Sequence, residues 1–265
     1  MNTFGIPLKK PISAADSEVL QEKSINNQNK DRWIKHALVL ETMTHDYFSL
    51  FSIWDAVNHE YIYISTKGKK LIGDDPGLSV GQNGVNFCFS KIHQDYKAGT
   101  ILFIEKISAL RQIAFNDQVK NNIKFSASFD YLFKQPDGNY FHMVQLCREA
   151  ETTLSGEPMI ILNYYFDVSH LKKINSQTLV VASSSLIHIY HFDFSSKELI
   201  SVKPISKTEI SILNFLACGK NSKEIANEIF ISHHTVDTHR RHLLNKLNCI
   251  DTTAMINYAK MIGII

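Results

Sequence analysis

The sequence predicts an α+β protein in two parts, an N-terminal antiparallel sheet with helices and a C-terminal all-α unit of four short helices. Runs that alternate apolar and polar residues, separated by turn sequences, fill most of residues 41–194. After residue 204 the pattern changes, and helix-start signals recur four times. The length of 265 residues also exceeds that of one small domain.

The overall composition, 44% hydrophobic and 20% charged, is that of an ordinary globular protein. No apolar run is long enough to span a bilayer, and the N-terminus lacks the basic-then-apolar order of a signal peptide. The sequence therefore predicts a cytoplasmic protein with no membrane partner. Four cysteines without a C-x-x-C pair indicate reduced thiols rather than a disulfide framework or a zinc site: Cys88, Cys147, Cys218 and Cys249.

The N-terminal part begins with a polar extension over residues 1–30, which is rich in Asn, Lys and Ser. We expect a helix, two strands, a glycine-rich region with short helices, a second helix and three more strands to follow. The expected bounds are 31–43 and 101–119 for the helices, and 47–54, 61–65, 123–134, 140–148 and 159–168 for the strands. Pro136-Asp137-Gly138-Asn139 predicts a hairpin turn within the last three strands.

Residues 172–203 form a strand-rich connector. Strand-like runs lie at 179–182 and 186–194, where apolar and polar residues alternate. The pattern leaves two interpretations open: the strands extend the sheet, or the segment is a hinge. No heptad repeat is present, so the sequence does not predict a long coiled coil as the connection.

The C-terminal unit, residues 204–265, opens with two helices that have matching start signals. Ser206 and Glu209 form a capping box in front of three apolar residues at helical spacing, Ile210, Leu213 and Leu216. Gly219 is placed to end this first helix. Asn221 and Glu224 form the second capping pair, so a new helix begins at once.

The joint between the second and third helices is very short. Only Phe230 and Ile231 stand before Ser232, which can cap the third helix. Two helices joined so tightly must cross steeply, and this is the helix-turn-helix geometry. Such a unit places its second helix in the DNA major groove. Asp251 predicts the start of a fourth helix, which ends at Gly263.

The third helix has an apolar and a polar face. Val236, Leu243 and Leu247 fall at helical spacing and are expected to face inward. The opposite face carries side chains suited to phosphate oxygens and base edges, namely His234, Thr238, Arg241 and Asn245, flanked by Asp237 and Arg240. An ordinary solvated helix face is the alternative. Residues 203–265 hold eight Lys and Arg against five Asp and Glu, a mild basic excess that favours nucleic acid.

Six short stretches give this unit a specific resemblance. They are Ile205-Ser-x-x-Glu209, Gly219-x-Asn-Ser-Lys-Glu-Ile-Ala226, Ile231-Ser-x-x-Thr-Val236, Thr238-His-Arg-Arg241, Lys246-Leu247 and Gly263-Ile-Ile265. The segment, about a quarter of the chain, resembles the DNA-binding domain of LuxR-type regulators. The resemblance implies phosphate contacts by Lys223, Thr235 and His239, base-facing positions at Asp237, Thr238 and Arg241, and dimerisation through the fourth helix. The full predicted DNA-binding set is Lys223, His234, Thr235, Asp237, Thr238, His239, Arg240, Arg241, Asn245 and Lys246.

Two residues depart from the LuxR pattern. Asp237 stands where a lysine is frequent, and Thr252 replaces a frequent arginine. An acidic side chain in a phosphate-rich groove lowers affinity unless it accepts a hydrogen bond from a cytosine amine. These departures predict modest intrinsic affinity, helped by dimerisation or by a basic partner surface.

The N-terminal part carries a second resemblance, to PAS domains, over roughly residues 41–171. The local matches are Ile62-Tyr-Ile-Ser65, Leu71-Ile-Gly73, Ile92-His-Gln-Asp95, Lys134-Gln-Pro-Asp-Gly138 and Phe166-Asp-Val-Ser169, with Gln94 in place of a usual proline. The resemblance implies a ligand sensor, a cofactor domain or a protein-contact module. No cofactor is evident. Cys88 lacks a flavin-attachment context. His93 and His142 are better explained as surface or core histidines than as haem ligands. A small-molecule ligand still fits the resemblance.

The predicted function is that of a DNA-binding transcription regulator whose PAS-like domain, residues 31–171, controls dimerisation or DNA binding. The expected partners are double-stranded DNA, a second copy of the chain and RNA polymerase. The fourth helix presents an apolar stripe larger than so small a domain needs internally, which predicts a dimer surface: Met255, Tyr258, Ala259 and Ile262.

Three other interpretations compete with this one. An interaction adaptor whose helix-turn-helix no longer reads DNA is favoured by Asp237. A sigma-factor-like tail is disfavoured by the fourth helix and its Gly-Ile-Ile ending. The sequence does not predict an enzyme, because it has no Gly-rich phosphate loop, no H-E-x-x-H and no G-x-S-x-G. His239, His242 and Cys249 imitate a metal site but lie on or beside the DNA-facing helix.

Overall fold

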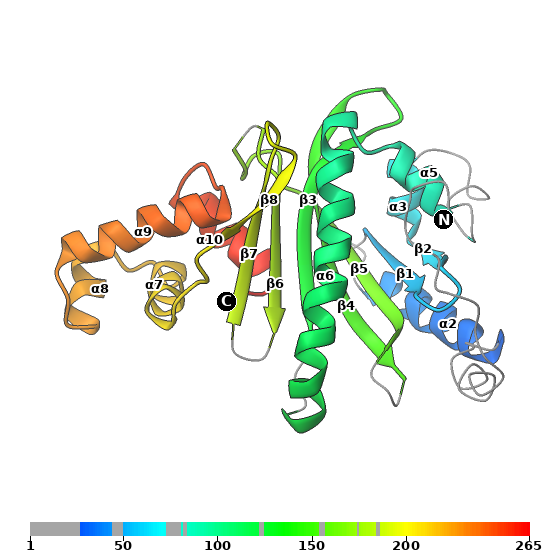
Figure 1. The fold of residues 1–265 in the computed structure, drawn as a ribbon, viewed down its shortest axis with the longest axis horizontal. Helices are drawn as coiled ribbons and strands as arrows, with labels where there is room; N and C mark the ends of the chain where they lie inside the picture. The colour runs from blue at the N-terminus through cyan, green and yellow to red at the C-terminus, as the bar shows by residue number, and fades with distance from the viewer. Residues whose placement is uncertain are drawn as a thin grey trace.

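A single antiparallel sheet organises the described part of the chain. The computed structural model describes residues 27–43, 50–72, 81, 84–121, 125–153, 157–173, 175–183 and 186–265. Its eight strands run in the order β2-β1-β5-β4-β3-β6-β7-β8 (Figure 1). They are β1 Phe51–Asp55, β2 Glu60–Ile64, β3 Ser126–Lys134, β4 Tyr140–Thr152, β5 Pro158–Asp167, β6 Thr178–Ser183, β7 Leu186–Asp193 and β8 Glu198–Val202. The predicted α+β class is confirmed.

The connector lies within the sheet. Strand β6 pairs with β3, and β7 and β8 continue the sheet beyond it. Of the two interpretations left open by the sequence, sheet extension is therefore the observed one. Strand β8 was not predicted. It is an edge strand with no buried residue, and Ile200 is exposed, so its sequence lacks the apolar alternation that identifies a half-buried strand.

Among the described helices, three cover one face of the sheet. The long helix α6 (Gln94–Asn121) runs along β3 (Figure 1) and also contacts β6 and β8, and α3 (Thr66–Ile72) and α5 (Gly84–Ser90) lie towards β1 and β2. Helix α6 begins seven residues before the predicted bound. Gly99 allows its close approach, because a Cβ there would lie 2.1 Å from Gln177 Oε1 and 2.7 Å from the Phe192 ring.

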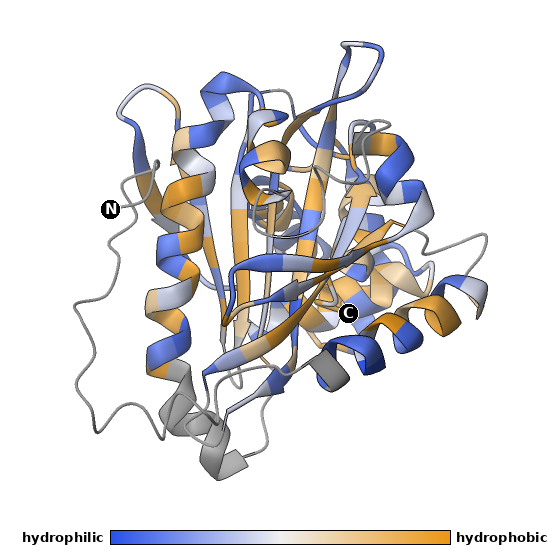
Figure 2. Ribbon diagram, turned by 90° about the vertical axis from the view of Figure 1, so that its right-hand side faces the viewer, coloured by the Kyte–Doolittle hydropathy of each residue, from blue (hydrophilic) through white to orange (hydrophobic). Residues whose placement is uncertain are grey.

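The opposite face is covered by α2 and by the C-terminal helices. Helix α2 (Asn27–Met43) begins inside the predicted polar extension, and its Ala37 packs in a core cluster with Phe51, Ile53 and Ile160. The strands carry apolar residues along their length (orange in Figure 2), as expected of a sheet that is covered on both faces. Because strand side chains alternate between faces, neighbouring residues serve the two different layers.

The four C-terminal helices are α7 (Lys207–Ala217), α8 (Ser222–Glu228), α9 (His233–Leu247) and α10 (Thr252–Met261). All four predicted start signals are confirmed: Ser206 and Asn221 form complete capping boxes, and Ser232 and Asp251 accept hydrogen bonds from the amides of Thr235 and Ala254. Gly219 and Gly263 follow α7 and α10 with φ of +82° and +75°, the left-handed conformation that glycine tolerates best.

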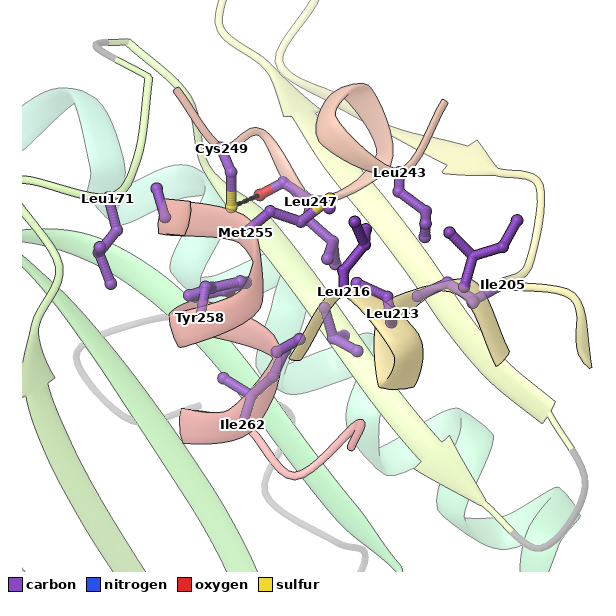
Figure 3. Close-up of a cluster of buried hydrophobic side chains, with 14 of the residues drawn as sticks. Leu171, Ile205, Leu213, Leu216, Leu243, Leu247, Cys249, Met255, Tyr258 and Ile262 are labelled. Atoms are coloured by element: carbon purple, nitrogen blue, oxygen red, sulfur yellow. Dashed lines mark hydrogen bonds between the residues drawn. The ribbon is translucent and has the colours of Figure 1, made fainter. Parts of the chain in front are cut away.

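The C-terminal helices share their hydrophobic core with the sheet (Figure 3). Met255, Tyr258 and Ala259 of α10 are fully buried, in one cluster with Val144 and Leu171 of the N-terminal part. The predicted apolar stripe on the fourth helix therefore exists, but its interpretation as a free dimer surface was wrong. The sheet of the same chain covers it.

Candidate nucleic-acid interface

The turn between α8 and α9 has the geometry of a helix-turn-helix. Helix α8 ends at Glu228 with Ile229 as its C-cap, and the amide of Ile231 donates to the carbonyl of Ala226 at 3.1 Å. Phe230 between them takes a left-handed φ of +55°, and its side chain is 92% exposed. The left-handed residue reverses the chain within two positions, so α9 can start at once from the Ser232 cap.

Helix α9 buries one face and presents the other to solvent. The predicted inward residues Val236, Leu243 and Leu247 are all fully buried. On the opposite face, His234, Arg241 and Asn245 are exposed. The remaining candidates of the first turns are also accessible at least in part, namely Thr235, Asp237, Thr238 and His239 on α9 and Lys223 on α8. The fold thus brings these predicted contact residues together on one surface.

Arg240 joins three helices and contacts both residues that depart from the LuxR pattern. Its Nη1 donates to Ser222 Oγ at 2.6 Å and lies 3.4 Å from Asp237 Oδ1, and its Nη2 donates to Thr252 Oγ1 at 3.0 Å. Ser222 Oγ in turn donates to Asp237 Oδ1 at 2.6 Å. Asp237 is therefore an ionised carboxylate with its charge balanced beside it, which reduces the repulsion expected from an acid in the groove.

The same contacts set the ionisation of Asp237. The hydrogen bond from Ser222, followed by the charge of Arg240, holds the pKa of Asp237 below its ordinary value. The guanidinium of Arg240 is already occupied by protein partners on both of its amino groups. Arg240 consequently supports the α8–α9–α10 arrangement as well as bordering the exposed face.

Lys246 does not belong to the exposed surface, so its assignment as a DNA contact needs correction. It is only 9% exposed, and its Nζ bonds to both carboxylate oxygens of Glu209, at 2.8 and 2.7 Å, and to the carbonyl of Pro204 at 3.0 Å. The three donors of the ammonium are used inside the protein. Burial alone would raise the pKa of Glu209, but the bond from Lys246 lowers it below its ordinary value.

One basic residue beside α9 was not predicted from the sequence. Lys173, in the segment after β5, is exposed, and its Nζ donates to Asn245 Oδ1 at 3.2 Å. The two residues are 72 positions apart. Only the docking of the C-terminal helices on the sheet brings them together, and no local pattern could have predicted this contact.

A cavity of about 300 Å³ lies between the sheet and helices α3, α5 and α6. The lining residues that the structure describes are mostly apolar and include no Asp, Glu, Lys, Arg or His. The polar groups on its sheet side bond to one another: Tyr131 Oη donates to Gln145 Oε1 at 2.9 Å, Gln145 Nε2 donates to Asn163 Oδ1 at 3.0 Å, and Ser52 and Tyr165 share a hydrogen bond of 2.9 Å. The site is neutral as well as apolar.

Two thiols line this cavity, and both are protonated at neutral pH. Burial raises the pKa of Cys88 and of Cys147 to about 12. Within the described residues, no group of three or more His, Cys, Asp or Glu side chains is placed to hold a metal ion. No helix among these residues is long and apolar enough to cross a membrane.

Comparison with known proteins identifies the family. Residues 203–259 match the model described as "Bacterial regulatory proteins, luxR family". The oxygen regulatory protein NreC of Staphylococcus epidermidis is 39% identical over 187 residues, which cover 70% of this chain and 72% of NreC. The chain belongs to the luxR family of bacterial regulatory proteins. The resemblance noted in the sequence is thus confirmed, and the chain is a LuxR-type transcription regulator.

Other relatives of this LuxR-type regulator match over shorter stretches. The transcription regulator BvgA of Bordetella pertussis is 41% identical over 66 residues, or 25% of this chain. The chain spans only 31% of the length of BvgA. Among solved structures, the VqmA–ligand–DNA complex of Vibrio cholerae covers 84% of the chain, with 14% identity and a TM-score of 0.31.

Proposed function

We propose that this LuxR-type regulator is a cytoplasmic protein that binds double-stranded DNA through α9, under the control of a PAS-like domain. The observation that carries the proposal is the exposed polar face of α9, which a complete set of caps and inward apolar residues holds in place. A helix presented in this way fits the major groove. We take residues 204–265 as the DNA-binding domain and the sheet with its helices as the controlling domain.

The contacts can be divided by role. Thr238 and Arg241, with Asp237 beside them, face the base edges, where a guanidinium can read a guanine by two hydrogen bonds. The others contact phosphates and position the helix, namely Lys223, His234, Thr235, His239 and Asn245. Lys173 adds a positive charge at the far end of α9. Arg240 acts by holding Asp237 and the neighbouring helices.

The cavity supports control by a small neutral ligand. The strands and helices around the cavity follow one another in the order that the PAS resemblance predicts. The volume of the cavity is at the lower end of the range for small-molecule sites. Because the described lining residues carry no charged side chain, a charged ligand would be buried among them without a partner, at a large cost in free energy. A compact, mostly apolar molecule with one or two neutral hydrogen-bonding groups fits this lining.

We also propose that the regulator acts as a homodimer on DNA and meets RNA polymerase there. One helix-turn-helix reads few base pairs, so useful specificity needs two half-sites. The apolar stripe of α10 is available for pairing only if the C-terminal helices leave the sheet. A dimer of the docked form must use another surface.

DNA binding is tested with the full chain and fragments selected from a genomic library. Arg241→Ala should weaken binding to the selected fragments by about 1–3 kcal/mol and relax the preference over random DNA, because it removes a base contact. Lys223→Ala should weaken both kinds of DNA alike and reduce the salt slope by about 1, because it removes a phosphate contact. Binding that is absent or insensitive to salt would support the adaptor interpretation instead.

A further inference from the structure

The cavity and the DNA-binding domain lie back to back on the same strands. Phe129 and Tyr131 of β3 line the cavity, while Asp130 between them points to the opposite face. Strand β4 repeats this arrangement, since Met143 lines the cavity and Val144 belongs to the core shared with the C-terminal helices. A single layer of backbone therefore separates the two sites.

Asp130 is a charged residue of the strand layer that separates the cavity from the C-terminal helices. It is fully buried, and Oδ2 accepts from His142 Nε2 at 2.6 Å while Oδ1 accepts from the amide of Thr178 at 3.1 Å. Lys172 Nζ lies 3.3 Å from the same Oδ1. Burial alone would raise the pKa of Asp130, but Lys172 and His142 hold it below its ordinary value. The carboxylate is thus held by β4, by β6 and by the segment after β5.

Lys172 connects this carboxylate to the DNA-binding helices. Its Nζ donates to the carbonyl of Leu247, the last residue of α9, at 2.7 Å. It also lies 4.3 Å from the centre of the Tyr258 ring of α10. A cation is favoured at the C-terminal end of a helix, where the carbonyl groups carry partial negative charge. The same lysine therefore holds the end of the recognition helix and one face of α10.

The backbone on either side of Lys172 is tied to the same place. The amide of Ile250 donates to the carbonyl of Leu171 at 3.1 Å, and the amide of Lys173 donates to the carbonyl of Asn248 at 2.9 Å. The α9–α10 junction is thus attached to the segment after β5 on both sides of the lysine. A displacement of that segment must move the junction or break these bonds.

We propose that the Asp130–Lys172 ion pair couples the contents of the cavity to the position of α9 and α10. The proposal deepens the proposed function, since it gives the means by which the PAS-like domain controls the DNA-binding domain. Filling the cavity displaces β3 through Phe129 and Tyr131, and Asp130 moves with them. Apolar contacts tolerate small sliding movements, but a buried ion pair loses its stabilisation when the geometry changes, and the unpaired charges are costly. Asp130 and Lys172 act as positioning residues.

The first test measures docking directly, in the full chain and without DNA. Amide hydrogen exchange at Lys173, Ile250 and α10 reports whether the C-terminal helices stay on the sheet. Asp130→Asn leaves Lys172 buried and unpaired, so exchange there should rise at least about tenfold, while α7 and α8 stay protected. Unchanged exchange at these amides would overturn the proposal.

The second test asks whether the pair transmits changes in the cavity. Tyr131→Phe removes the bond to Gln145 on the cavity side and should alter exchange in α10. In the charge-neutral double variant Asp130→Asn/Lys172→Met, the same change should have no further effect there. Ile161→Val, on the cavity-lining side of β5, two strands away from β3, is the matched control and should leave α10 unaltered in both backgrounds.

These outcomes separate coupling from a purely structural role. If the effects of Tyr131→Phe and of the neutralised pair on α10 simply add, the pair only supports the fold, and the coupling proposal is wrong. If Asp130→Asn unfolds the whole chain, the charge-neutral double variant still decides the question, because it leaves no unpaired charge. Failure to bind DNA would refute the proposed function without changing the exchange results.

Discussion

Two lysines are buried in the part of the chain that the structure describes, and each has a carboxylate and a backbone carbonyl as partners. Lys172 has Asp130 and Leu247, and Lys246 has Glu209 and the carbonyl of Pro204. A buried ammonium is tolerated only where its hydrogen bonds are complete. Each lysine therefore lies where segments distant in the sequence are in contact, and its hydrogen bonds require those segments to pack in one defined arrangement.

Removing the partner of Lys246 should be far more costly than removing a similar residue at the surface. Glu209→Ala leaves a buried cation unpaired and is expected to lower the free energy of unfolding by about 3–5 kcal/mol. Glu224→Ala is the matched control, because Glu224 closes the equivalent capping box on an exposed helix end, and the expected loss is about 1 kcal/mol. Urea unfolding of the full chain measures both, and equal losses would contradict the role given to Lys246.

A histidine at the domain contact should make docking sensitive to acid. His191 Nε2 donates to the carbonyl of Lys246 at 2.8 Å. Burial, assisted by the charge of Lys172, lowers the pKa of His191 from its ordinary value of 6.5, although the bond to Lys246 opposes this shift. The folded state therefore binds its proton less readily than the unfolded state, so the stability is complete above pH 6.5 and is lost as the pH falls through the lowered pKa.

The expected result is a smaller loss of stability in a variant that cannot be protonated. Between pH 7 and pH 5, His191→Gln should lose less thermal stability than the natural sequence, because the amide still donates to the carbonyl but takes up no proton. His188→Gln, on the other face of the same strand, should keep the natural pH dependence. If all three proteins show the same slope, His191 does not contribute.

At the scale of elements, short-range sequence patterns predict the helix starts, whereas contacts between distant segments leave no such pattern. The four helix starts were predictable because each cap bonds to an amide two or three residues away. The burial of Lys246 was not, because Glu209 lies 37 positions away. The apolar stripe of α10 was also predictable, because it follows from helical spacing within one segment. The sequence of α10 does not indicate that the sheet covers this stripe.

The shared core predicts that the isolated C-terminal domain is weakened. A fragment of residues 200–265 would expose Met255, Tyr258 and Ile262, each nearly or fully buried in the chain. We expect it to bind DNA weakly, to self-associate at high concentration and to lose at least about 3 kcal/mol of stability relative to the same helices in the full chain. Hydrogen exchange of α7–α10 and sedimentation at several concentrations measure this. A fragment that is monomeric and equally protected would show that docking adds little.

Across the whole molecule, the sheet separates a neutral cavity from the helices that we propose bind DNA. The sequence predicted the two parts of the chain that are arranged in this way, a strand-rich part and a helix-turn-helix. It could not predict that β6 pairs with β3 or that the domains share one core, because both depend on contacts between segments many tens of residues apart.

The neutrality of the cavity gives a direct test with simple probes. Indole should bind and raise the melting temperature of the full chain in a concentration-dependent manner. Indole-3-carboxylate has a similar ring but carries a charge that the lining cannot pair, so it should give a much smaller shift. Ile161→Phe fills part of the cavity and should reduce the effect of indole. Equal shifts from the two probes would contradict a neutral site.

The core shared by the sheet and the C-terminal helices has a consequence for protein engineering. A chimaeric regulator could be made by joining the DNA-binding helices of one chain to the sheet of another, with the splice just before the helix-turn-helix. In this chain a splice at residue 203 would leave strand β8 in place but would strip the sheet of the helices that cover Val144, Val180 and Ile189. A working chimaera would have to carry over the matching surface of the sheet, together with Asp130 and Lys172. The segment that must be transferred with the DNA-binding function is thus larger than the C-terminal helices alone.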